Sequence, residues 1–202
     1  GDHAVALGSV GGMAERAGAG AALWFDAHGD LNTPETTPSG NVHGMPLAAV
    51  LGQAENGFAS DAWPLPALAA ERVSLIGVRS LDAGERTIVR ELGIAVYTMS
   101  EIDRRGMEEV VREALDRAAG AAFVHVSLDM DAVDPDVAPG VGTPVRGGLS
   151  YREAHLAMEL VAESGLLDSF EIVEVNPILD RVNETAELAV ELAASALGAR
   201  IL

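Results

Sequence analysis

Short apolar runs that read as buried strands alternate along this chain with longer segments of helical periodicity, and this alternation limits the fold more than any other feature. The predicted strands lie at 21–26, 73–78, 94–98, 122–128 and 170–175. Strands that are separated by helices usually pair in parallel. The chain is therefore predicted to be an α/β protein with a central, mostly parallel sheet flanked by helices.

Helix starts are marked by a capping residue that is followed three positions later by an acid. The chain has three such pairs: Asp82 with Glu85, Ser100 with Asp103, and Ser150 with Glu153. A last helix is predicted at about 183–198, and residues 60–70 read as a surface loop. With 202 residues, of which 49% are hydrophobic, we expect one domain with a substantial core.

Polar residues follow the predicted strands at the ends where parallel sheets bind ligands. The first strand runs into FDAHGD, in which Asp26, His28 and Asp30 alternate and so point to one side of an extended chain. In HVSLDMD, at the fourth strand, four polar residues share one parity: His125, Ser127, Asp129 and Asp131. A single aspartate after a strand is usually a turn or capping residue, but two such clusters together predict a metal centre.

The charge of these clusters indicates the kind of metal. Four aspartates carry −4, which two divalent cations would balance, whereas without cations the carboxylates would repel or take up protons. The chain has no cysteine, so the ligands must be oxygen and nitrogen atoms. This set suits manganese, with iron, cobalt, nickel and zinc as alternatives. Two ions could share a water and convert it to hydroxide, which predicts metal-assisted hydrolysis.

Composition argues against several other classes of function. The formal net charge of −18 disfavours nucleic acid and anionic membrane surfaces as partners. All thirteen basic residues are arginine, so a lysine Schiff base is not available. No apolar run approaches the roughly 20 residues of a membrane span. We expect a small cationic substrate and a cytoplasmic location.

The chain contains four separated segments that agree with one family in order and spacing: GDHAVALG, FDAHGDLNTPETTPSGNVHGMPLAA, SLDMDAVDPDVAPGVGTPVRGGLSYRE and EVNP. They resemble the ureohydrolases, specifically the bacterial arginases, over nearly all of the 202 residues. The resemblance implies a three-layer arginase-like fold that assembles as a homotrimer or homohexamer. It also implies that residues 1–202 are a single catalytic domain, the C-terminal two-thirds of a longer chain, because family members carry a segment ahead of GDH.

The resemblance implies two Mn²⁺ ions per subunit. One site would use His3, Asp26, Asp30 and Asp129, and the other Asp26, His28, Asp129 and Asp131. His43 matches the histidine assigned to proton transfer and Glu174 the glutamate that pairs with the substrate guanidinium, and Asp30 is also placed among the catalytic residues. The positions that match the two ends of an arginine substrate are Asn32, Thr37 and Ser39 for its carboxylate, and Asp82 and Glu85 for its α-amino group.

Each of these assignments also has a plainer interpretation. His3 could be a surface residue, His43 a loop histidine, and Glu174 an ordinary acid at a strand end. Asp82 and Glu85 also form a capping pair, and Asn32, Thr37 and Ser39 could simply stabilise a turn-rich loop. Among the other polar residues, we expect His125 and Ser127 to support ligands by hydrogen bonding, Asp2 to support His3, Asp134 to form a turn, and His155 to be structural.

The implied activity is hydrolysis of L-arginine to L-ornithine and urea by hydroxide held between the metals. Arginine is favoured over agmatine because agmatine has no carboxylate for Asn32, Thr37 and Ser39 to bind. Three alternatives stay open: a ureohydrolase acting on agmatine or guanidinobutyrate, a two-metal phosphoesterase, and a non-catalytic metal-binding assembly protein. A phosphoesterase should place basic residues beside the phosphate, and the motif loops carry only Arg79 and Arg146.

Overall fold

The fold is built on one sheet of five parallel strands. A computed structural model describes residues 1–199, with the side chains of residues 55 and 56 left aside. The strands are β1 (Gly20–Phe25), β2 (Leu68–Val78), β3 (Ala95–Thr98), β4 (Val124–Asp129) and β5 (Ser169–Val173), in the order β3-β2-β1-β4-β5. Every pair of neighbours is parallel. The predicted α/β fold with a central parallel sheet is therefore confirmed.

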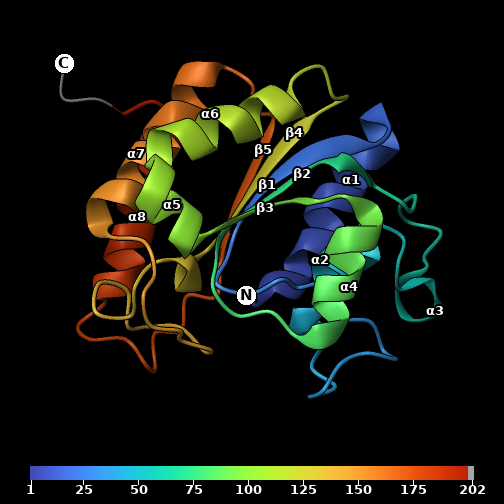
Figure 1. The fold of residues 1–202 in the computed structure, drawn as a ribbon, viewed down its shortest axis with the longest axis horizontal. Coiled ribbons are helices and arrows are strands. Elements are labelled where there is room, and N and C mark those ends of the chain that lie inside the picture. Colours follow the sequence, from blue (N-terminus) through green and yellow to red (C-terminus); the bar gives the residue numbers. More distant parts are fainter. Residues whose placement is uncertain (200–202) are drawn as a thin grey trace.

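Helices cover both faces of this sheet, which makes three layers (Figure 1). One face is covered by α5 (Met99–Arg105), α6 (Met107–Ala118), α7 (Tyr151–Ser164) and α8 (Glu184–Ala196). The other is covered by α1 (Ala6–Ala17), α2 (Pro46–Val50) and α4 (Ala83–Leu92). The shorter elements are η1 (His3–Val5), η2 (Val42–Gly44), α3 (Glu55–Phe58) and η3 (Met130–Ala132). None of the helices described at residues 1–199 has the length and apolar character that crossing a membrane requires.

The central strand β1 supplies side chains to both cores. Ala21, Leu23 and Phe25 pack with α6, α7 and α8, whereas Ala22 and Trp24 pack with α1 and α2. This division follows from the alternation of side chains along a strand. A strand that is buried on both faces belongs in the middle of a parallel sheet, and burial of each large apolar side chain contributes about 1.5–3 kcal/mol.

The direction of the strand order reverses between β1 and β4. From β1 the chain adds β2 and β3 on one side, and then returns to add β4 and β5 on the other. Phe25 of β1 lies beside Leu128 of β4, so the two polar segments that follow these residues meet at the carboxyl edge of the sheet. Such a reversal is the usual ligand site in open α/β sheets.

Three sequence predictions are wrong in detail. The surface loop predicted at 60–70 ends earlier, because β2 already begins at Leu68, which pairs with Gly20. The segment lacks the β-branched pattern of the later part of β2, so only its pairing with β1 reveals it as strand.

The second error concerns α5, whose predicted capping pair was Ser100 with Asp103. The capping box is instead formed by Thr98 and Glu101. Both pairs fit the sequence template, and the pair at the end of β3 is used because the chain turns directly from strand to helix. The other two capping boxes are confirmed at α4 and α7. The last helix starts after Asn183 as predicted, but ends at Ala196, two residues before Gly198.

Candidate metal centre

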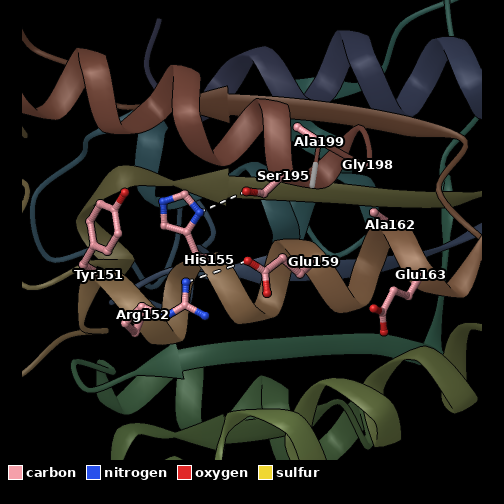
Figure 2. Close-up of a pocket in the computed structure, with 9 residues that line it drawn as sticks. All are labelled: Tyr151, Arg152, His155, Glu159, Ala162, Glu163, Ser195, Gly198 and Ala199. Atoms are coloured by element: carbon pink, nitrogen blue, oxygen red, sulfur yellow. Dashed lines mark hydrogen bonds and ion pairs between the residues drawn. The ribbon is translucent and has the colours of Figure 1, made fainter. Parts of the chain in front are cut away.

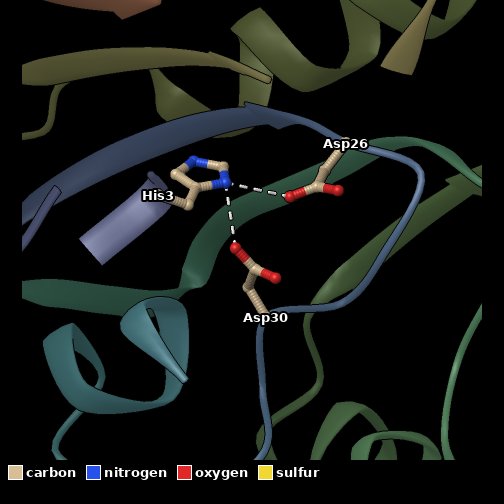
Figure 3. Close-up of side chains that lie close together, drawn as sticks. All are labelled: His3, Asp26 and Asp30. Atoms are coloured by element: carbon tan, nitrogen blue, oxygen red, sulfur yellow. Dashed lines mark ion pairs between the residues drawn. The ribbon is translucent and has the colours of Figure 1, made fainter. Parts of the chain in front are cut away.

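One group of ligand atoms surrounds His3, which lies in η1 and is 1% exposed. Its Nδ1 atom is 3.1 Å from Asp26 Oδ2, 2.9 Å from Asp30 Oδ2 and 3.2 Å from Asp129 Oδ2. Figure 3 shows the histidine pointing toward Asp26 and Asp30, which come from the chain after β1. The structure thus brings together four residues from three distant parts of the sequence.

A second group adjoins the first and shares Asp26 with it. His28 Nδ1 is 3.0 Å from Asp131 Oδ2 and 3.3 Å from Asp26 Oδ1. The two oxygens of Asp26 therefore face different histidines, Oδ2 toward His3 and Oδ1 toward His28. Within the described residues, His3–Asp26–Asp30 and Asp26–His28–Asp131 each have the proximity needed to hold a metal ion. Asp129 stands beside His3 and accepts a hydrogen bond from Asp131 N.

The donor atoms of this centre fit divalent cations. His3 Nε2 lies 2.7 Å from Ser127 Oγ, and Ser127 donates its own proton to Glu171 Oε1 over 2.9 Å. Ser127 must therefore accept from Nε2, which leaves the lone pair of a neutral His3 on Nδ1. In the described part of the chain, Nδ1 of His3 and Oδ2 of Asp30 are buried without a hydrogen bond of ordinary geometry. A bound ion would supply the partner that these two buried atoms lack.

The same crowding shifts the pKa values of these residues. Burial and then repulsion from Asp26 raise the pKa of Asp30 to about 8, and the pKa of Asp129 is raised for the same reasons. Burial alone would lower the pKa of His28, but hydrogen bonds with Asp131 and Asp26 outweigh it and raise the pKa to about 11.

Asp26 and His3 complete this pattern. Burial would raise the pKa of Asp26, but His28 and His3 hold it below its usual range. Burial would lower the pKa of His3, but the neighbouring aspartates raise it well above its usual value. Protons therefore balance part of the negative charge, and a cation would have to displace them.

Several supporting residues were missed by sequence reasoning. The indole of Trp24 stacks on the His3 ring at a centroid distance of 4.1 Å, and its Nε1 donates to Asp26 Oδ2 over 3.2 Å. Thr143 Oγ1 donates to Asp131 Oδ2 over 3.1 Å. A tryptophan within an apolar run reads as core and a threonine within a glycine-rich loop reads as turn, so neither carries a signal in the sequence.

The predicted supporting role of Ser127 is confirmed, whereas that of Asp2 is wrong. The Asp2 carboxylate caps η1 by accepting from Ala4 N over 3.0 Å. His125 is linked to His3 through Glu171 and Ser127: its Nε2 is 3.3 Å from Glu171 Oε1, and its Nδ1 is 3.0 Å from Ser169 Oγ. Asp134 forms the predicted turn, since its carboxylate accepts from the backbone of Asp136, Gly147 and Gly148.

A cavity of about 290 Å³ opens over the metal centre. His43 and Glu174 both line it, with His43 Nδ1 3.6 Å from Glu174 Oε1. Glu174 adopts a left-handed backbone conformation with φ of 64°, and its Oε1 accepts from His3 N over 3.1 Å. A left-handed non-glycine residue is strained, and such strain is concentrated at functional sites.

The loop after β1 forms one wall of this cavity. Thr37 Oγ1 accepts from Gly40 N over 3.0 Å, and Ser39 Oγ accepts from Asn41 N over 3.2 Å. Each hydroxyl therefore keeps its own proton to donate to a ligand. Asn32 is less free, because its Nδ2 donates to Asp82 Oδ2 over 2.9 Å and its Oδ1 accepts from Thr36.

The pair Asp82 and Glu85 also lines the cavity and caps α4. Glu85 Oε2 accepts from Asp82 N over 2.7 Å, and Glu85 Oε1 accepts from Leu31 N over 3.2 Å. Burial raises the pKa of Glu85. Both oxygens of Glu85 accept hydrogen bonds from backbone N–H groups, whereas Asp82 is exposed and lines the cavity. Asp82 can therefore cap α4 and also face a ligand in the cavity.

His155 lies on α7 at a second cavity of about 640 Å³, which is lined by residues of α7, by Ser195 of α8 and by the residues that follow α8 (Figure 2). Its Nδ1 is 2.9 Å from Ser195 Oγ, and its ring packs against Tyr151. The contact with Ser195 joins α7 to α8, as expected of a structural histidine.

Comparison with known proteins gives a consistent result. The model of the arginase family matches residues 1–198. Arginase from Bacillus subtilis is 52% identical over 202 residues, which are the whole chain and 68% of that protein, and arginase from Brevibacillus brevis is 49% identical over 203 residues with the same coverage. The crystal structure of arginase from Bacillus cereus matches all of this chain over 70% of its own length, with a TM-score of 0.97 and 50% identity.

Proposed function

This chain belongs to the arginase family and is a hydrolase, and from that premise we propose that it cleaves L-arginine to L-ornithine and urea with two Mn²⁺ ions per subunit. The observation that carries the proposal is the pair of histidine–aspartate groups that share Asp26 beneath a cavity lined by His43 and Glu174. Relatives that are about half identical bear the name arginase.

Manganese is proposed because the candidate ligands are carboxylates and imidazoles. Hard oxygen donors with a few nitrogen donors suit this ion, and the absence of cysteine from the sequence removes the thiolates that other metals prefer. We propose His3, Asp26, Asp30 and Asp129 for one ion and Asp26, His28, Asp129 and Asp131 for the other. When bound, such a pair of ions lowers the pKa of a shared water and makes it a nucleophile near neutral pH.

The residues of the chain would bind and orient the substrate around this centre. The Glu174 carboxylate, together with Asp30, faces the cavity, and a carboxylate can accept paired hydrogen bonds from the planar guanidinium group. His43 lies 3.6 Å from Glu174, where its imidazole can pass a proton to the departing amine. Asn32, Thr37 and Ser39 would hold the carboxylate of arginine, and Asp82 with Glu85 would face its α-amino group.

The lining of the cavity bears on the alternatives. Among the described residues that line it, none is arginine, and the sequence has no lysine, so a phosphate group would find neither of the side chains that usually bind it. This argues against a phosphoesterase. A hydrolase of agmatine or guanidinobutyrate would keep the metal centre, but agmatine has no carboxylate for Asn32, Thr37 and Ser39 to hold, and guanidinobutyrate has no α-amino group for Asp82 and Glu85 to face.

The deciding experiment measures urea release from arginine, agmatine and guanidinobutyrate, together with the metal content of the protein. We expect two Mn²⁺ per chain and a clear preference for arginine. A preference for agmatine or guanidinobutyrate would replace the proposed substrate. Absence of urea release from all three by fully loaded protein would favour a non-catalytic metal-binding assembly protein.

Three further points are proposed from the family resemblance. The chain acts as one catalytic domain, assembles as a homotrimer or homohexamer, and works in the cytoplasm. Light scattering after size-exclusion chromatography tests the assembly, and a monomer at micromolar concentration would contradict it.

A further inference from the structure

Arg79, which follows β2, has a guanidinium group that donates only to backbone carbonyls among its described hydrogen bonds. Nη2 donates to Asp131 O over 2.7 Å and to Val145 O over 2.7 Å, and Nε also donates to Val145 O over 3.1 Å. Nη1 donates to Ala132 O over 3.1 Å and to Gly77 O over 3.2 Å. Because backbone carbonyls already accept from Nε, Nη1 and Nη2, this guanidinium has a structural role rather than a role in binding substrate.

Apart from Gly77 O in β2 itself, the carbonyls come from two segments that together support Asp131. The first segment is 131–133, which contains the metal-ligand candidate itself. The second is 143–149, in which Thr143 donates to Asp131 Oδ2 over 3.1 Å. Leu149 N donates to Ala132 O over 3.0 Å, so the segments are also joined directly. Arg79 thus connects the end of β2 to both sides of the Asp131–Thr143 contact.

The packing leaves no room for a larger side chain than glycine at position 148, beside this guanidinium. A Cβ atom on Gly148 would lie 2.5 Å from Arg79 Nη2 and 2.7 Å from Ala132 O. The positive charge of Arg79 also acts on Asp131, Asp134, Asp26 and Asp129. The group is therefore a fixed cation at the edge of the acidic centre, held in one place by its neighbours.

Its hydrogen bonds, unlike its charge, favour one of the two metal groups. The described hydrogen bonds of Arg79 reach the backbone of Asp131 and its neighbours, but none reaches His3, Asp26 or Asp30. His3 is held instead by Ser127 and Trp24. The two groups share Asp26 and are linked by the hydrogen bond from Asp131 N to Asp129 Oδ1, but the contacts that hold His3 differ from those that hold Asp131.

We propose that Arg79 is a positioning residue that holds Asp131 against His28 and thereby sets the affinity of that metal group alone. The inference rests on the proposed function, since it requires that the centre binds two ions. A planar guanidinium with five donors can hold carbonyls of two segments at once, whereas an ammonium cannot reproduce that geometry.

The test replaces Arg79 without removing a ligand. Arg79→Lys keeps the charge and loses the fork, and Arg79→Met removes both; Arg146→Lys, at an exposed neighbour of Val145, is the matched control. Mn²⁺ binding is followed by calorimetry and by electron paramagnetic resonance, which distinguishes a coupled pair of ions from a single one. We expect Arg79→Lys to weaken one of two ions about 10- to 100-fold, to shift the spectrum toward a single ion, and Arg146→Lys to change neither.

Two backgrounds identify the affected group. In His3→Ala the remaining ion should depend on the His28 group, and adding Arg79→Lys should weaken it about 10- to 100-fold. In His28→Ala the remaining ion should depend on the His3 group, and adding Arg79→Lys should leave its affinity within about twofold.

Other results would overturn the inference in distinct ways. Equal weakening in both backgrounds would show that Arg79 serves the fold in general, and no weakening in either would show that it has no role in metal binding. If wild-type protein bound no Mn²⁺, the proposed function would fail first. If wild-type protein bound two ions and Arg79→Lys bound them equally well, only this inference would fail.

Discussion

Asp26 is the residue on which both metal groups depend, because its two oxygens face different histidines. We expect Asp26→Ala to lose both ions, since neither group keeps its full set of donors. His28→Ala should lose one ion and keep the other. Metal analysis after gel filtration measures both results, and retention of two ions by Asp26→Ala would contradict the shared role.

His43 lines the cavity but lies outside both metal groups. If it transfers protons, His43→Ala should lower kcat by about 100-fold or more while metal content stays at the wild-type level. Steady-state kinetics with parallel metal analysis checks this. Loss of metal from the variant would instead assign His43 a structural role.

The ligand candidates could be predicted because they follow strand ends, where polar side chains gather in a parallel sheet. The strand alternation itself does not extend to them, because β1 ends at Phe25, the chain bends at residues 27 and 28, and Asp30 has a left-handed φ of 52°. This bend brings Asp30 to His3 and His28 to Asp131. Trp24 and Thr143 could not be found in this way. Their roles arise from contacts between segments far apart in the sequence, and such contacts leave no local pattern.

The helices α4 and α7 begin with similar capping boxes in different surroundings. Asp82 of the α4 box lines the cavity, whereas Ser150 of the α7 box lies outside it. Asp82→Asn should keep the cap, since asparagine is an equally good capping residue, and should raise KM for arginine by removing a charge near the α-amino group. Asp82→Ala should also lower the free energy of unfolding by about 1 kcal/mol.

Ser150→Ala is the matched control for this pair. It should cost about 1 kcal/mol of stability and leave KM unchanged. Denaturant unfolding and steady-state kinetics separate the two effects. An unchanged KM in both Asp82 variants would leave the cap as the sole function of Asp82.

All five strands were predictable from their short apolar runs, and their positions follow from the parallel pairing. The element boundaries that were predicted wrongly depend on contacts with other segments of the chain. The start of β2 depends on pairing with Gly20, and the cap of α5 depends on where β3 ends. Local patterns give the type of an element more reliably than its first residue.

The metal-free molecule as a whole should lose stability as the pH rises. The folded-state pKa of Asp30 is about 8, above the unfolded value of about 3.9, so its contribution is complete below pH ~4 and is lost as the pH rises to 8. His28, at about 11 against about 6.5, loses its contribution between those values. The pKa of Asp26 is lowered, so its contribution is lost only on acidification.

Thermal unfolding of chelated protein between pH 5 and 9 measures this balance. We expect the melting temperature to fall across that range and Mn²⁺ to restore it, most strongly at the alkaline end, where fewer protons compete for the ligands. A melting temperature that rises with pH in the absence of metal would contradict the protonation pattern described for the centre.

The position of His3 in η1 has one more consequence. An ion held there and at Asp129 would join sequence positions 3 and 129, and so would act as a reversible cross-link in a chain that has no disulfide. A cross-link that closes a long loop should stabilise the folded state the most, because it removes the most conformational entropy from the unfolded chain. Removal of the ion by a chelator should therefore allow η1 and α1 to open locally. Trypsin should then cut first at the exposed Arg16 of α1, and added Mn²⁺ should prevent this cleavage.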